Sequence, residues 1–122
     1  MPDEYTNLVN ALKALTQGEA PDPVVTLPMA ENEWNTRPDS VSYGIVSLDF
    51  EADSLNGDDG KQMTSWQGSV DLFVRMKKDL ERLKDLVENA LEEVCEASWQ
   101  VNSIQHESQT GYFHYEWVFE VE

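Results

Sequence analysis

Apolar residues recur every three to four positions in two segments, the pattern of a helix with one buried face. The first segment spans residues 3–16 and the second residues 79–96. Asp3 fits the N-terminal cap of the first helix and Gly18 fits its stop. The apolar positions are Tyr5, Leu8, Leu12 and Leu15 in the first helix and Leu80, Leu83, Val87, Ala90, Leu91 and Val94 in the second.

Alternating apolar and polar residues predict four strands, over residues 41–50, 66–76, 97–107 and 111–122. Within the first strand the apolar face changes near Ile45 and Val46, which predicts a bulge or burial on both sides of the sheet. Residues 24–29, which include Pro28, fit either an additional short strand or a loop.

A helix with one apolar stripe packs on the apolar face of a sheet. The pattern therefore predicts one domain, residues 1–122, of the α+β class. We expect a single mostly antiparallel sheet of about four strands with two helices packed on one face, in the order α-β-β-α-β-β. Residues 51–65 are expected to form a long polar connection with turn signals at Asn56-Gly57 and Asp59-Gly60.

The junction between the second strand and the second helix has only Lys77 and Lys78 between the two patterns. It lacks the glycines of a phosphate-binding loop and the Ser or Cys of a nucleophile elbow, so we interpret it as a structural corner. Basic residues cluster there, namely Arg75, Lys77, Lys78 and Arg82. This cluster fits either a contact with an acidic neighbour or a solvated helix start.

The charge balance is strongly acidic, with 24 Asp and Glu against 8 Lys and Arg and a net charge of −16. A field of this sign repels phosphate backbones and anionic lipids, so we expect neither sequence-specific nucleic-acid binding nor membrane association. The N-terminus lacks the pattern of a signal peptide, so secretion by that route is not expected. The excess of acidic side chains has three possible roles. It keeps the protein soluble, it lines a channel through which nucleic acid passes, or it imitates nucleic acid.

Residues suited to catalysis or metal binding are few. His106 and His114 flank the last predicted turn; if Ser108 pairs with Gly111, the two imidazoles lie diagonally or on opposite faces. A metal site would also need Glu107 or Glu116, and surface roles are the commoner fate of such histidines. Cys95 is the single cysteine and lies at a helix end, where the dipole raises a thiol pKa. We therefore expect no enzyme, no cofactor and no metal.

Trp34 lies in a polar stretch between Glu33 and Asn35. It is expected either to plug one end of the core or to anchor a partner, and intramolecular burial is the commoner fate of a Trp.

The layout as a whole resembles the tail terminator, or tail completion, proteins of long-tailed bacteriophages and prophages. The resemblance lies in the order of EYTNLVNALKAL, VSYGIVSLDF, GSVDLFVRM, KKDLERLKDLVENALEEV and YFHYEWVFEVE. It implies a non-enzymatic subunit of a ring, usually a hexamer, that caps the tail tube and joins it to the head. Its partners would be other copies of itself, the tail tube protein and head-tail connector proteins.

The resemblance also implies a location in the virion tail after assembly in the host bacterial cytoplasm, with DNA passing through the ring. Asp53, Asp58 and Asp59 in the long connection are then expected at the lumen or rim. The interface residues expected with a neighbour are Trp34, Arg75, Lys77 and Lys78.

Two other classes stay open. An acidic mimic of nucleic acid would bind a basic host protein through carboxylates at phosphate-like spacing. The helix face that could do this carries Glu81, Asp85, Glu88, Glu92 and Glu96. An adaptor or chaperone-like subunit with the same fold is the third class.

Overall fold

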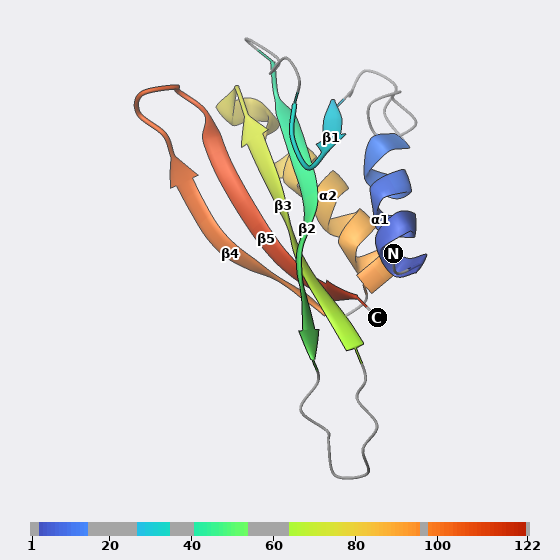
Figure 1. Ribbon diagram of the computed structural model, residues 1–122. Helices are drawn as coiled ribbons and strands as arrows, with labels where there is room; N and C mark the ends of the chain where they lie inside the picture. Colours follow the sequence, from blue (N-terminus) through green and yellow to red (C-terminus); the bar gives the residue numbers. More distant parts are fainter. Residues whose placement is uncertain (1–2, 15–26, 35–40, 54–63, 96–97, 122) are drawn as a thin grey trace.

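The computed structural model is an α+β structure in which one five-stranded sheet carries both helices on the same face (Figure 1). It describes residues 3–14, 27–34, 41–53, 64–95 and 98–121, excluding the side chains of 49–53 and 64–65. The elements in chain order are α1 (Asp3–Ala14), β1 (Met29–Glu31), β2 (Tyr43–Asp53), β3 (Thr64–Val74), a 3-10 turn (Lys77–Asp79), α2 (Leu80–Cys95), β4 (Trp99–His106) and β5 (Phe113–Val121).

The sheet has the strand order β1-β2-β3-β5-β4. Strands β2, β3, β5 and β4 pair antiparallel, as predicted, whereas β1 pairs parallel with β2. The prediction of about four strands in the order α-β-β-α-β-β therefore lacks one strand. The additional short strand left open for residues 24–29 exists but begins only at Met29, and residues 24–26 lie outside the described residues. The extra strand is three residues long and follows Pro28, so it is too short for a periodic signal, and its register is set by pairing with β2.

Both faces of β2 carry buried residues near its start. Tyr43 is 1% exposed and pairs with Phe73 on the face away from the helices, whereas Val46 is fully buried and pairs with Val70 beneath them. This confirms burial on both sides of the strand. The bulge lies further along, between Leu48 and Phe50, and not at the change of face.

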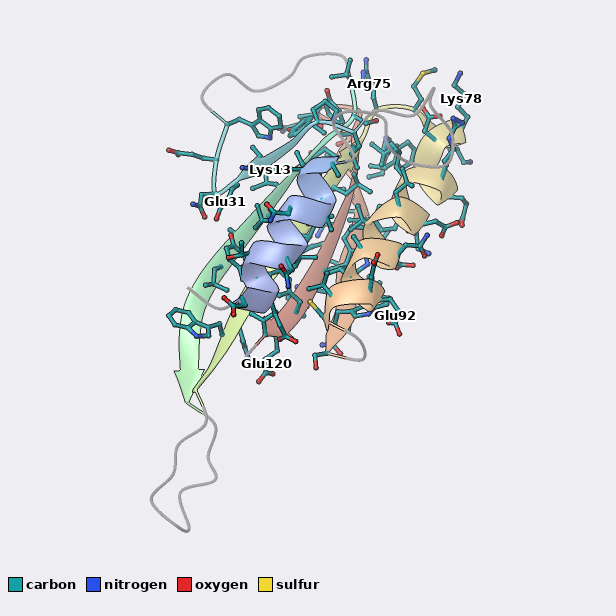
Figure 2. The ribbon with its side chains drawn as sticks, turned by 90° about the vertical axis from the view of Figure 1, so that its right-hand side faces the viewer. Lys13, Glu31, Arg75, Lys78, Glu92 and Glu120 are labelled. Atoms are coloured by element: carbon teal, nitrogen blue, oxygen red, sulfur yellow. The ribbon has the colours of Figure 1, made fainter. Side chains whose placement is uncertain are left out.

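The main core lies between the helices and the sheet (Figure 2). Helix α1 buries Leu8 and Leu12, α2 buries Val87 and Leu91, and Trp117 of β5 is fully buried beneath them. The Tyr5 hydroxyl donates to Glu31 Oε2 at 2.9 Å, which ties α1 to β1.

The β2–β3 hairpin is longer than predicted. Ala52 pairs with Ser65 and Asp53 pairs with Thr64, two pairs beyond Trp66, which lies opposite Val121 near the end of β5. The ends of the polar connection are thus strand, and Figure 1 shows these paired ends of β2 and β3 projecting past the rest of the sheet. Asp53 is at the end of β2, whereas Asp58 and Asp59 lie outside the described residues.

The corner between β3 and α2 is tight, as predicted. Strand β3 ends at Val74, the turn Lys77–Asp79 follows, and the Asp79 N–H donates to Met76 O at 2.9 Å. The Arg75 N–H donates to Ser42 Oγ at 2.9 Å, which fixes the corner to the start of β2. Among the described residues, no helix is both long enough and apolar enough to cross a membrane.

Candidate interaction surfaces

The corner surface, as we call it, combines exposed apolar and basic side chains at one end of the sheet (Figure 2). Its members are Val41, Arg75, Met76, Lys77 and Lys78. Val41 is 46% exposed and Met76 is 51% exposed. The Arg75 guanidinium lies 5.6 Å from the centre of the Tyr112 ring. Within the described part of the chain, the side chains of Lys77 and Lys78 are exposed and form no ion pair, so both charges are available to a partner.

A second exposed apolar surface lies along the edge strand β4. Val101 pairs with Trp117 and Ile104 pairs with Tyr115, so both side chains are on the helix-bearing face. They are nevertheless 39% and 60% exposed, because β4 is the edge strand and α2 packs mainly on the neighbouring strand β5. Apart from His106, β4 contains no titratable residue, although the chain is strongly acidic.

Carboxylates of α2 border this strand. The Trp99 indole N–H donates to Glu92 Oε2 at 2.7 Å, and the Trp117 indole N–H donates to Glu88 Oε2 at 3.0 Å. Glu88 also pairs with Lys84 at 3.2 Å, and this contact raises the pKa of the lysine. We define the β4 surface as Trp99, Val101 and Ile104 together with Glu88 and Glu92.

These contacts bear on the proposed mimic face of α2. Glu88 and Glu92 each accept a hydrogen bond from an indole of the sheet, and Glu96 lies outside the described residues. Among the described carboxylates of that face, Glu81, Asp85 and Glu92 are exposed, whereas Glu88 is half-buried and pairs with Lys84.

The face of the sheet away from the helices carries an aromatic cluster. Tyr43 stacks on Phe73 at 4.8 Å and meets Tyr112 edge-on at 5.5 Å. Trp34 is half-buried, meets Tyr43 edge-on at 6.1 Å, and its indole N–H donates to Gly44 O at 3.1 Å. Trp34 thus has intramolecular contacts, at the same end of the sheet as the corner surface.

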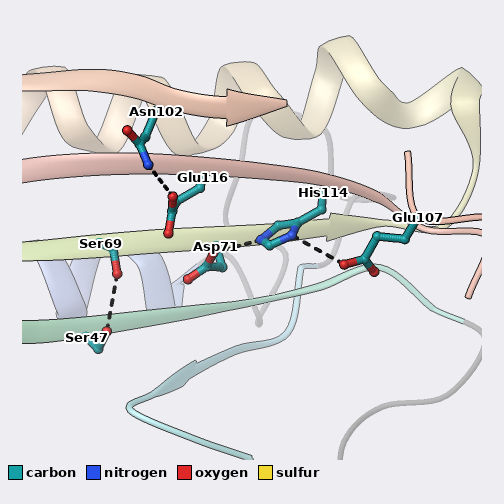
Figure 3. Close-up of polar contacts among 7 residues, drawn as sticks. All are labelled: Ser47, Ser69, Asp71, Asn102, Glu107, His114 and Glu116. Atoms are coloured by element: carbon teal, nitrogen blue, oxygen red, sulfur yellow. Dashed lines mark hydrogen bonds and ion pairs between the residues drawn. The ribbon is translucent and has the colours of Figure 1, made fainter. Parts of the chain in front are cut away.

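His114 lies between two carboxylates next to this cluster (Figure 3). Its Nε2 is 2.7 Å from Asp71 Oδ1, its Nδ1 is 3.5 Å from Glu107 Oε2, and its ring stacks on Phe73 at 4.2 Å. Both ring nitrogens face carboxylates, so neither is placed to activate a hydroxyl nucleophile. His106 pairs with Phe113 on the opposite face, which confirms the predicted separation of the two imidazoles.

Glu107 and Glu116 were predicted only as the carboxylates that a metal site with two histidines would need. Glu107 lies beside His114, whereas Glu116 accepts a hydrogen bond from Asn102. Asp71 was missed, because its approach depends on the pairing of β3 with β5. Within the described ranges, no group of three or more His, Cys, Asp or Glu residues is arranged to hold a metal ion.

Open hollows lie on the sheet, and two of them are lined by described residues. One, of about 440 Å³, is lined by residues that include Gln67, Trp99 and Glu120. The other, of about 550 Å³, lies beside His114 and is lined mainly by the β4–β5 turn. The lining side chains of the first, Gln67, Gln100, Val118 and Glu120, pair across the face of the sheet away from the helices, so this hollow is not part of the β4 surface.

Cys95 is buried at the end of α2. Burial raises the pKa of its thiol from 9.0 to about 12, and Glu4 acts in the same direction. The folded protein therefore keeps this proton above pH 9 whereas the unfolded chain loses it, so stability is present below pH 9 and falls between pH 9 and 12.

We expect this loss to reach about 1.4 kcal/mol per pH unit, measured by urea unfolding of the native protein against Cys95→Ala. Identical pH dependence for the two proteins between pH 9 and 11 would contradict the assignment.

Of the expected interface residues, Arg75, Lys77 and Lys78 lie together, and Trp34 approaches them through Tyr43 and Tyr112. Asp53 is described only in its backbone. The exposed apolar residues Val41, Met76, Val101 and Ile104 were not predicted as site residues. For β4, the available signal was two aliphatic residues in an otherwise polar, uncharged strand.

A comparison of the chain with protein-family models and with curated protein sequences finds no match.

Proposed function

We propose that this chain is a non-enzymatic structural subunit that assembles into a ring at the head-proximal end of a phage or prophage tail. The observation that carries the proposal is that the large exposed apolar side chains of the described residues occupy two separate surfaces, at the corner and along β4. A subunit that repeats around a ring needs two different surfaces, one for each neighbour. The element order adds the resemblance to tail terminator proteins.

The acidic charge has a role in such a ring. DNA that passes through an opening lined with carboxylates is repelled from the wall and slides without binding. In this proposal the projecting β2–β3 hairpin, with Asp53 at the end of β2, reaches a neighbouring subunit or the tail tube. The partners are other copies of this chain, the tail tube protein and head-tail connector proteins, and the assembled location is the virion tail.

The test is the mass in solution, measured by light scattering coupled to size exclusion over a range of protein and salt concentrations. We expect one discrete oligomer, favoured by salt that screens the net charge of −16, or formed when a tail tube protein from the same genome is added. Monomers under every condition, including with the tail tube protein, would refute the proposal. A salt-sensitive complex with a basic host protein would then support the mimic.

A further inference from the structure

We infer that the corner surface of one copy docks on the β4 surface of the next copy, head to tail. This inference rests on the proposed function, because it specifies the contact from which the ring is built. The occupant of each surface is thus a second copy of this chain.

The first argument is the distribution of exposed apolar side chains. Among the described residues, the large hydrophobic side chains with the greatest exposure are Val41 and Met76 at the corner and Val101 and Ile104 on β4. Each surface presents two such side chains, and burial of either pair in water-excluding contact is favourable at about 25 cal/mol per Å² of apolar area. The two pairs lie on different elements: Val41 and Met76 lie before β2 and after β3, whereas Val101 and Ile104 lie on the edge strand β4, with Ile104 toward the same end of the sheet as the corner.

The second argument is charge. A chain with a net charge of −16 associates with itself only where acid does not face acid. The corner surface supplies Arg75, Lys77 and Lys78, and the last two have no ion-pair partner within the described residues. The β4 surface supplies the exposed carboxylate of Glu92 beside an uncharged strand, whereas the charge of Glu88 is already paired with Lys84 at 3.2 Å. In the docked pair, the basic and apolar side chains of the corner surface therefore contact the acidic and apolar side chains of the β4 surface.

The edge of β4 also indicates how the contact forms. A bulge between Val101 and Ser103 interrupts the regular ladder, and bulges in edge strands oppose the addition of a further strand. Contact through side chains is therefore favoured over a continuous sheet. A symmetric contact of β4 with β4 would bring the carboxylates of both α2 helices together, whereas the head-to-tail contact pairs opposite charges.

A head-to-tail contact leaves one free corner surface and one free β4 surface on every dimer. Repetition of that contact closes into a ring or continues as a filament, depending on the rotation between copies. This property allows a test in which the two surfaces are disabled on different copies.

The experiment uses two charge-reversed variants of the full chain. K77E/K78E reverses the corner surface, and Glu92→Lys reverses an exposed carboxylate of the β4 surface. Each variant alone presents like charges across the contact, so we expect its dissociation constant to rise at least about tenfold. Mixed in equal amounts, the two variants present opposite charges at every contact, so the oligomer is expected to return.

The matched controls are Glu93→Lys, which makes the same change on the neighbouring exposed residue of α2, and Lys13→Glu in α1. Both are expected to assemble like the native chain. Since Glu92 accepts the Trp99 indole N–H, circular dichroism and thermal unfolding are recorded for every variant. Ile104→Ser is a second variant of the β4 surface; its side chain is 60% exposed, so it is expected to weaken assembly without affecting folding.

The outcomes separate the two proposals. If the K77E/K78E chain and the Ile104→Ser chain each assemble like the native chain, this inference is overturned and the proposed function stands. Failure of the mixed variants to reassemble, although each is folded, also overturns it. A native chain that is monomeric in every condition removes both proposals together.

Discussion

Replacement of Gly68 by alanine is expected to destabilise the protein by about 2–3 kcal/mol. A Cβ atom at this position would lie 2.4 Å from Ser47 O and 2.4 Å from Phe119 Cζ, closer than any real contact. Ser47 O belongs to the backbone of β2, and the Phe119 ring is 3% exposed, so neither can move without disturbing the sheet or the core. Gly68 lies opposite Leu48, at the bulge of β2, and permits this close approach.

Gly44→Ala is the matched control for Gly68→Ala. Gly44 lies on the same face of the sheet, and a Cβ there would meet Met29 Sδ at 2.5 Å and Asp71 O at 3.0 Å. The thioether of Met29 is flexible and can rotate away, so we expect a cost of less than about 1 kcal/mol. Urea unfolding followed by circular dichroism measures the loss of unfolding free energy for both variants. Equal destabilisation by the two substitutions would show that the backbone approach at Gly68 is not the cause.

Local periodicity predicted the elements whose packing depends on one regular face. Helices α1 and α2 and strands β2, β3, β4 and β5 were predicted at nearly their observed positions, and so was the hairpin that places His106 opposite Phe113. In each case the signal extends over eight or more residues.

Non-local pairing explains what was missed in the fold. Strand β1 has three residues, and no local pattern in Met29–Glu31 predicts its parallel pairing with β2. The bulge after Leu48 depends on the opposite strand, where the paired residue, Gly68, has no side chain.

The interaction surfaces were predicted only through their charges. The basic cluster at Arg75, Lys77 and Lys78 is visible in the sequence because its members are neighbours. The exposure of Val101 and Ile104 could not be predicted, because an alternating strand looks the same whether or not a helix covers it. Which strand lies at the edge depends on the order β1-β2-β3-β5-β4, which has no local signal.

Trp117→Ala is expected to have the largest effect of any single substitution considered, a loss of about 3–5 kcal/mol of unfolding free energy. The Trp117 side chain is fully buried, stacks on Tyr115 at 5.6 Å, and packs in the main core beneath α2. Truncation removes this apolar contact and leaves a cavity that the surrounding sheet cannot close. Since small domains are stable by about 5–15 kcal/mol, such a loss unfolds a substantial fraction of the protein.

Two variants separate burial from hydrogen bonding. Trp117→Phe keeps most of the buried ring but removes the indole N–H that donates to Glu88 at 3.0 Å. We therefore expect it to lower the free energy of unfolding by about 1–2 kcal/mol. Trp99→Ala removes the equivalent bond to Glu92 at 2.7 Å from a half-buried indole on the edge strand, and we expect a similarly small loss. Chemical unfolding followed by circular dichroism gives all three values. A cost for Trp99→Ala as large as that for Trp117→Ala, measured at concentrations where the chain is monomeric, would contradict the half-buried position of Trp99 at the edge of the sheet.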